Sequence, residues 1–462
     1  MIQYLRKIFS KRLTNSGIIF CFLIALFCQL LSFSSGSLHS NISIYDEAQH
    51  IDYSVHLAGG HVPVYGTELT DNTRRLIYCY PDAEGTTNGM PNVPAATSAC
   101  TNNLVIPFNV PHGYNYEAQQ PFLGYLPYAV AWDLLGLSSK NPSTQLVSLR
   151  LVNIFWAIVS SLSLLAIYRR FRPRLDVAIA GILFLYLNPL ALYSISYVTN
   201  DSSAIATGLF SVNLYYWLNE RIAIQKRFST LFLYGSYGVI LSLLRATYVL
   251  IPVLVLLGII TFRNKLSNYK ILRYHQLIQL LVTISTTILY QLVIRFAGTV
   301  STATVLHVVN PTSVASPLTF QQVTSTISAV SGIFSVYWWP PPIGPFQNLI
   351  YSGPLIIFLF LCAGITLINL IHPIRLGESE DLMSAIAPAT ISTFFLFSLF
   401  FTFLYFVINQ GAQWAPPRYL LPIFPFLLVP ILNQLMTNKR FIFLFNIVGI
   451  VTLISLIYTP FK

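Results

Sequence analysis

The chain has 462 residues, of which 55% are hydrophobic and 9% are charged, whereas soluble domains average about 25% charged residues. With a mean hydropathy of +0.64, this composition excludes a soluble multidomain protein and predicts an all-α polytopic membrane protein built from helices of about 20 residues. The net charge of +11 does not indicate nucleic acid, because the basic residues lie in short clusters between apolar runs, where they set topology in a lipid bilayer.

The first apolar run covers residues 17–33 and follows the basic residues Arg6, Lys7, Lys11 and Arg12. A signal peptide has the same basic-then-apolar order. The run is long, however, and no small-x-small cleavage site stands at its end. We therefore expect an uncleaved first span with its N-terminus in the cytoplasm.

A polar region rich in Asn, Thr, Pro and Gly follows, and we expect residues 36–146 to form the first extracytoplasmic loop. Segment 121–137 is apolar but short, and it contains Pro127 and Asp133. If this segment crossed the membrane, the arginines of segment 169–174 would face outward, against the positive-inside rule. We therefore expect an interfacial helix that lies on the membrane.

The remaining apolar runs alternate with basic clusters and predict about 11 transmembrane helices within a single domain, 1–462. Stretch 231–262 has basic flanks at both ends, which predicts a hairpin of two short spans with Arg245 near its outer turn. A second extracytoplasmic loop is expected at 298–348. The other expected spans cover 147–168, 177–196, 203–218, 276–297, 349–371, 385–409, 419–436 and 441–459.

Two of the five cysteines, Cys79 and Cys100, fall in the first extracytoplasmic loop. Because such a loop faces an oxidising compartment, we predict a disulfide between them, with two free thiols as the alternative. No CxxC or His/Cys pattern indicates zinc.

The first candidate site is the string from Tyr45 to Tyr53, just after the first span. Its adjacent acids Asp46 and Glu47 diverge on a helix, so one can face a site while the other supports the structure. His50 shares a helical face with Glu47. A carboxylate here can act as general base toward a hydroxyl. The alternatives are a solvated loop edge with Asp46 as helix cap, or a divalent cation held by oxygen ligands.

Four further candidates lie at the same predicted membrane face. Glu117 and Gln120 precede the interfacial helix, where they also suit a helix start. Asn200 and Asp201 precede a span, and helix capping is their alternative role. Arg245, inside an apolar stretch, is a functional candidate, or a snorkelling or salt-bridged side chain. Arg418, followed by Tyr419, lies where the positive-inside rule disfavours a basic residue, and its planar fork of donors suits a phosphate.

The sequence resembles the GT-C superfamily of membrane glycosyltransferases, which includes protein O-mannosyltransferases and lipid A aminoarabinose transferases. The acidic pair Asp46-Glu47 after the first span is similar to that superfamily's pair. The strings 46–50 and 59–63, Asn200-Asp201, segment 120–125 and Arg418-Tyr419-Leu420-Leu421-Pro422 resemble a bacterial group of membrane proteins, domain of unknown function family 2142.

This resemblance implies a GT-C-like fold in a bacterial plasma membrane and an inverting sugar transfer from a polyprenyl-phosphate donor to an extracytoplasmic acceptor. Asp46 would be the general base, and Glu47 would support the loop or bind the acceptor. Arg418, with Arg245, would bind the lipid phosphate. Relatives of the mannosyl and aminoarabinosyl type need no catalytic metal, so we expect neither a metal nor another cofactor.

Two other functional classes remain open from the sequence. A transporter or flippase for lipid-linked glycans would favour inverted repeats and polar sites in mid-membrane, and no repeat is evident. A non-enzymatic assembly or polymerase-type membrane protein is the other alternative.

Overall fold

The computed structural model describes residues 12–37, 42, 47–79, 115–223, 227–261, 263, 266, 268–298, 417–437 and 439–458, with a few positions between 357 and 393. These residues form helices joined by turns, and an isolated bridge pairs Arg12 with Arg174. Asp46, Cys100, nearly all of the second extracytoplasmic loop and most of the two predicted spans that follow it lie outside the described residues.

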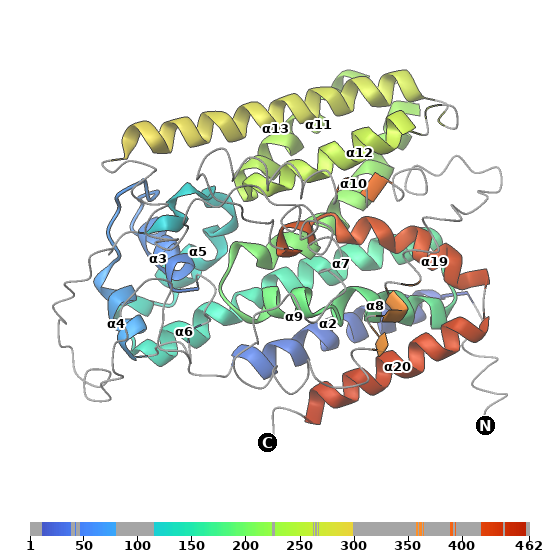
Figure 1. Ribbon diagram of the computed structural model, residues 1–462, viewed down its shortest axis with the longest axis horizontal. Coiled ribbons are helices and arrows are strands. Elements are labelled where there is room, and N and C mark those ends of the chain that lie inside the picture. Colours follow the sequence, from blue (N-terminus) through green and yellow to red (C-terminus); the bar gives the residue numbers. More distant parts are fainter. Residues whose placement is uncertain are drawn as a thin grey trace, which may run out of the picture.

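Two helical stretches in the described part of the chain are long and apolar enough to cross a membrane, Pro142–Phe171 and Tyr269–Ala297. The first is made of α6 (Pro142–Leu151) and α7 (Asn153–Phe171), and the second is α13 (Tyr269–Ala297). Helix α2 (Asn15–Ser37) packs against α7. Helix α13 runs along one edge of the molecule, against α11 (Arg227–Leu244) and α12 (Leu250–Thr261) (Figure 1).

The predicted span at 177–196 is broken into α8 (Leu175–Tyr186) and α9 (Pro189–Ser196), which are bent by 67° relative to each other. Asn188 caps α9 by accepting a hydrogen bond from the backbone N–H of Leu190 at 2.9 Å. Pro189 has no N–H and fits the first turn of a new helix but not the interior of a continuous one. The break makes a turn inside the bundle, which leads to segment 197–203.

The apolar stretch 231–262 divides at Arg245, where α11 ends and the short 3-10 helix η5 (Ala246–Val249) begins before α12. Arg245 therefore lies at the turn between two apolar helices, and its side chain is buried. Helix α10 (Ala204–Ala223) precedes this pair.

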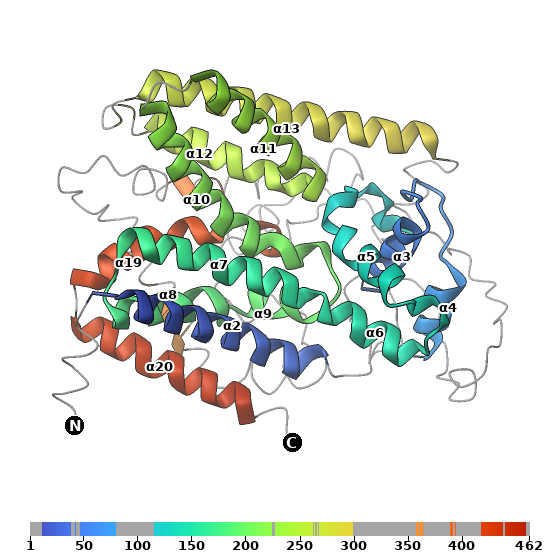
Figure 2. The same ribbon diagram turned by 180° about the vertical axis from the view of Figure 1, so that it is seen from behind.

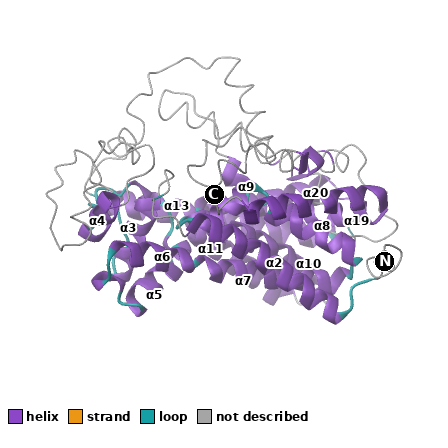
Figure 3. Cartoon of the chain, turned by 90° about the horizontal axis from the view of Figure 1, so that it is seen from below, coloured by secondary structure: helices purple, strands orange, loops and turns teal. Residues whose placement is uncertain are grey.

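The two ends of the first loop form a small helical unit of α3 (Glu47–Ala58), α4 (Asp71–Cys79), α5 (Leu126–Leu134) and α6. It lies at the opposite end of the molecule from α19 (Leu428–Thr437) (Figures 2 and 3). Its own apolar core includes Ile51, Leu76, Tyr128, Leu149 and Val198. The predicted interfacial segment is short and irregular here, with the 3-10 helices η2 (Phe122–Gly124) and η3 (Leu137–Ser139) on either side of α5.

The predicted span at 419–436 does not begin as a regular helix. It opens with the 3-10 helices η8 (Pro417–Leu420) and η9 (Phe424–Leu427) before α19, because three prolines interrupt the backbone ladder at Pro417, Pro422 and Pro425. A Cβ on Gly208 in α10 would lie 2.4 Å from the carbonyl oxygen of Pro422, so this turn packs directly on α10. Helix α20 (Lys439–Tyr458) then packs on α8 and α2.

Candidate functional site

The first loop is anchored by a buried ion pair between Glu47 and Arg150. The Nε and one terminal nitrogen of Arg150 donate to the two carboxylate oxygens of Glu47 at 2.8 and 2.7 Å. The backbone N–H of Val198 donates to the same carboxylate at 3.0 Å. Glu47 therefore joins α3, α6 and the turn after α9, and Arg150 is engaged by a carboxylate.

We predict that Glu47→Gln lowers the free energy of unfolding by about 3–5 kcal/mol, because it leaves the buried guanidinium of Arg150 without its counterion. Thermal unfolding in detergent measures this loss. The matched control is Glu68→Gln, since Glu68 pairs with Arg74 at 3.1 Å but is 70% exposed. An exposed pair contributes about 1 kcal/mol or less. Equal losses in the two variants would contradict the anchoring role.

A second buried network positions Glu117. The carboxylate of Asp52 accepts hydrogen bonds from the N–H and hydroxyl of Thr70 at 2.7 and 2.8 Å and from the amide of Asn115 at 2.9 Å. Asn115 in turn accepts from the backbone N–H of Glu117 at 2.9 Å and caps η1 (Tyr116–Gln119). Asp52 and Asn115 were not among the predicted site residues. For Asn115 the available signal was an asparagine one residue before a helix start.

Gln120 contributes its carbonyl oxygen to a contact with α13. The hydroxyls of Tyr53 and Tyr290 both donate to it at 2.9 Å, and the two hydroxyls lie 2.9 Å apart. The side-chain amide of Gln291 donates to the carbonyl of Gln119 at 2.6 Å. The segment that carries Glu117 is thereby tied to α13 as well as to α3.

The centre of the candidate site is a cluster of charges from three separate segments. Asp201 in η4 (Asn200–Ser203) forms an ion pair with Arg245, and its other carboxylate oxygen lies 3.7 Å from the Nε of Arg418. The guanidiniums of Arg245 and Arg418 lie 5.0 and 5.8 Å from the ring centre of Tyr419. The structure thus brings together four residues from three separate segments of the sequence, which we name the arginine cluster: Asp201, Arg245, Arg418 and Tyr419.

His50 lies beside the arginine cluster. Its Nδ1 is 2.8 Å from the hydroxyl of Tyr125 and 3.9 Å from a carboxylate oxygen of Glu117, and its Nε2 is 3.4 Å from the hydroxyl of Thr199. Burial lowers the pKa of His50 well below its usual value, and the positive charges of Arg418 and Arg245 lower it further. The imidazole is therefore neutral at pH 7.

The lowered pKa of His50 predicts a loss of stability in acid. Above pH about 6.5 the imidazole is neutral in both states, while below it the unfolded chain binds a proton that the folded chain does not. Stability should then fall as pH drops from about 6.5 to 5, by at most about 1.4 kcal/mol per pH unit for this group. Melting temperatures of the wild type and His50→Gln over this range test the expectation. Equal pH slopes for the two proteins would contradict it.

Gly124 allows the first loop to approach Arg245. A Cβ at this position would lie 2.9 Å from the carbonyl oxygen of Leu244, the residue before Arg245, so only a hydrogen fits there. The close contact sets the position of η2 against the end of α11.

Gly124→Ala should therefore destabilise the protein by about 1–3 kcal/mol, as overpacking against a fixed backbone does. Gly235→Ala is the control, because a Cβ at Gly235 in α11 meets nothing within 4 Å. Alanine is favoured over glycine in a helix by up to about 1 kcal/mol. Chemical unfolding of both variants gives the comparison. If Gly124→Ala proved as stable as the wild type, the close contact with Leu244 would not exist.

Of the remaining predicted residues, Asn200 and Cys79 are described by the structure, whereas Asp46 and Cys100 are not. Asn200 is buried, and its side-chain nitrogen has no hydrogen-bond partner within the described residues. Asp46 lies outside the described residues, immediately before α3. Cys79 ends α4 and is bonded in a disulfide, but Cys100 lies outside the described part, so the pairing of these two cysteines stays a prediction. Among the described residues, no group of three or more His, Cys, Asp or Glu side chains is placed to hold a metal ion.

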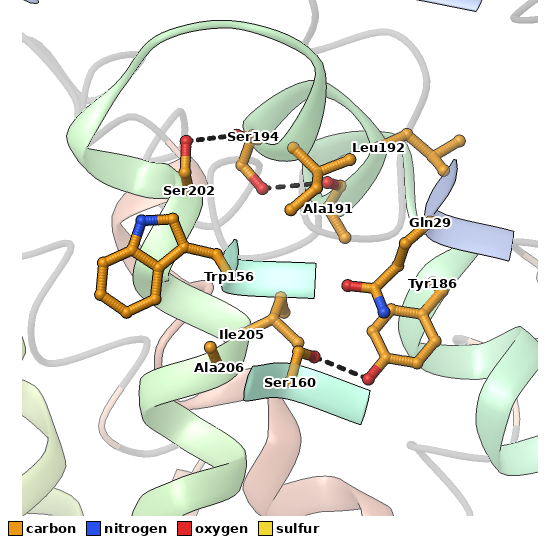
Figure 4. A pocket seen from close by; sticks show the side chains of 11 residues that line it. Gln29, Trp156, Ser160, Tyr186, Ala191, Leu192, Ser194, Ser202, Ile205 and Ala206 are labelled. Carbon is orange, nitrogen blue, oxygen red and sulfur yellow. Dashed lines mark hydrogen bonds between the residues drawn. The ribbon is translucent and has the colours of Figure 1, made fainter. Parts of the chain in front are cut away.

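A small cavity of about 10 Å³, roughly the space of one water molecule, lies near Ser202 (Figure 4). Ser160 and Tyr186 share a hydrogen bond of 2.6 Å across it, and Ser202 donates to the carbonyl of Ser194 at 2.7 Å. Its polar side chains mostly bind one another or the backbone, as Ser160, Tyr186 and Ser202 do.

Comparisons with known proteins support the fold. No family model matches the chain, and no curated protein matches it. The crystal structure of ArnT from Cupriavidus metallidurans bound to undecaprenyl phosphate is similar, with a TM-score of 0.51 and 13% identity over 96% of this chain. The chain covers 64% of that ArnT chain. The likeness supports a helical fold similar to that of ArnT, while membership of the GT-C superfamily, about eleven spans and the bacterial family 2142 stay predictions.

Proposed function

We propose that this protein is a membrane glycosyltransferase that moves a sugar from a polyprenyl-phosphate donor to an extracytoplasmic acceptor, with Asp46 as general base. The observation that supports it most is the meeting of the buried Arg245 and the half-buried Arg418 at Asp201, beside the first loop. Two guanidiniums present planar forks of donors that suit phosphate oxygens. The structurally similar ArnT carries undecaprenyl phosphate, which is the class of donor carrier proposed for this chain.

In the proposed reaction the acceptor hydroxyl attacks the anomeric carbon of the sugar from the side opposite the phosphate. A bond forms between the acceptor oxygen and that carbon, while the bond from the carbon to the phosphate oxygen breaks. The electron pair stays on the phosphate, and the acceptor proton passes to Asp46. The reaction therefore inverts the configuration at the anomeric carbon.

Each charged group has a role in this scheme. Arg245 and Arg418 stabilise the negative charge that develops on the leaving phosphate, which lowers the barrier because it acts on the transition state. Glu47, held by Arg150, fixes the start of α3, the helix that follows Asp46 in the sequence. His50 and Glu117, both in the first loop, lie beside the arginines, where they can contact the sugar or the acceptor.

The test is a transfer assay with purified protein in phospholipid vesicles. Undecaprenyl-phosphate sugars labelled in the sugar are supplied together with an envelope fraction from a Gram-negative bacterium as acceptor. The proposal expects the label to leave the lipid carrier, with undecaprenyl phosphate released in equal amount. Intact labelled donor that only moves between the two leaflets would indicate a flippase and would overturn the proposal.

A further inference from the structure

Asp201 occupies the place where the two arginines would hold a phosphate. Its carboxylate forms the ion pair with Arg245 and lies 3.7 Å from Arg418, and its side chain is only 2% exposed. Neither carboxylate oxygen has a hydrogen-bond partner within the described part of the chain. The two guanidiniums are thus the groups that stabilise this buried negative charge, and the carboxylate in turn offsets part of their positive charge.

The backbone holds Asp201 firmly in this position. Its N–H donates to the hydroxyl of Thr199 at 3.2 Å, and the hydroxyl of Ser202 donates to the carbonyls of Ser194 and Thr199 at 2.7 and 2.9 Å. Asn153 at the start of α7 donates to the carbonyls of Ile195 and Tyr197 at 3.0 and 2.8 Å. These hydrogen bonds hold the backbone on both sides of Asp201. Its carboxylate therefore stays close to any anion that the arginines bind.

A fixed carboxylate here affects the donor and the product differently. The donor phosphate is a diester with one negative charge, whereas the product is a monoester that carries up to two. Coulomb attraction grows with the charge of the ligand, so two buried arginines alone would bind the product more tightly than the donor. A fixed negative charge repels the monoester more strongly than the diester and reduces this difference.

We propose that Asp201 is a fixed counter-anion that weakens the hold of Arg245 and Arg418 on the product phosphate and thereby sets the rate of product release. This inference rests on the proposed function. It assigns Asp201 a positioning and charge-balancing role that capping of a helix would not require. If Asp201 only held the two arginines in place, removing its charge would misplace them. Binding of the product phosphate would then weaken.

The experiment measures undecaprenyl phosphate binding and transfer kinetics for Asp201→Asn, which keeps the size of the side chain and removes its charge. We expect binding of undecaprenyl phosphate to tighten about tenfold, the scale of one close charge interaction. We also expect the first turnover to keep its rate while the steady-state rate falls, so that a burst of product appears. The control is Asp176→Asn, because Asp176 pairs with Arg174 at the far end of α8. Weaker binding in Asp201→Asn, or the same tightening in Asp176→Asn, would overturn the inference.

A second measurement uses the wild type alone and tests the role of Asp201 even if Asp201→Asn does not fold. The wild type should bind farnesyl phosphate and its methyl diester with affinities within about a factor of three of each other. A preference for the monoester above about tenfold would mean that Asp201 does not offset the arginines. If neither probe bound in a manner that depends on Arg418, the proposed function itself would fail, which is a separate outcome.

Discussion

Arg418→Gln is expected to reduce transfer from an undecaprenyl-phosphate sugar by about 10²–10³-fold, the usual cost of removing one preorganised group that stabilises developing negative charge. The guanidinium of Arg418 lies 3.7 Å from Asp201 and lowers the pKa of His50, so it acts on the centre of the site. Arg418→Lys keeps the positive charge but loses the planar fork, and it should recover only part of the rate.

The control for Arg418 is Arg440→Gln, which removes an exposed arginine near the start of α20. Its transfer rate should equal that of the wild type. Initial rates at saturating and limiting donor separate binding from catalysis for each variant. A correctly folded Arg418→Gln protein with the wild-type rate would exclude this arginine from the phosphate site.

Asp46→Asn is expected to reduce transfer by about 10²–10⁴-fold, the range in which a positioned general base contributes. The alternative role of Asp46 is to cap the start of α3, and asparagine caps a helix about as well as aspartate does. The substitution should therefore leave the melting temperature unchanged while it removes the base. This contrast separates chemistry from folding at this position.

Asp71→Asn is the matched control for Asp46, because Asp71 begins α4 in the same loop and is 84% exposed. It should transfer at the wild-type rate. Single-turnover rates measured from pH 5 to 9 give the comparison. If Asp46→Asn kept full activity, another group would have to accept the proton of the acceptor hydroxyl, and Asp46 would not be the general base.

The charge cluster was predictable in part because both of its arginines are unusual in a membrane sequence. Arg245 lies inside an apolar stretch, the predicted topology places Arg418 outside, and the same topology predicts the acid Asp201 at that face. The partner of Glu47 was not predictable. Glu47 is buried because Arg150 lies against it in the fold, and 103 residues separate the pair in the sequence.

The break between α8 and α9 could also be predicted from the sequence, whereas a contact between distant helices could not. Asn188-Pro189 is an N-cap followed by a proline, a pattern that marks a new helix and was available in the sequence. Hydropathy over a window of spanning length averages across such a break, so a single span was predicted. The contact of Tyr53 and Tyr290 with the carbonyl of Gln120 depends on packing between α3 and α13 and left no local signal.

The most direct test of the whole account is an experimental structure of the protein with undecaprenyl phosphate bound, in lipid nanodiscs. We predict that the phosphate lies within hydrogen-bonding distance of both Arg245 and Arg418, with the carboxylate of Asp46 facing the same cavity from the start of α3. A phosphate bound elsewhere, or an Asp46 side chain that points away from the two arginines, would contradict the account.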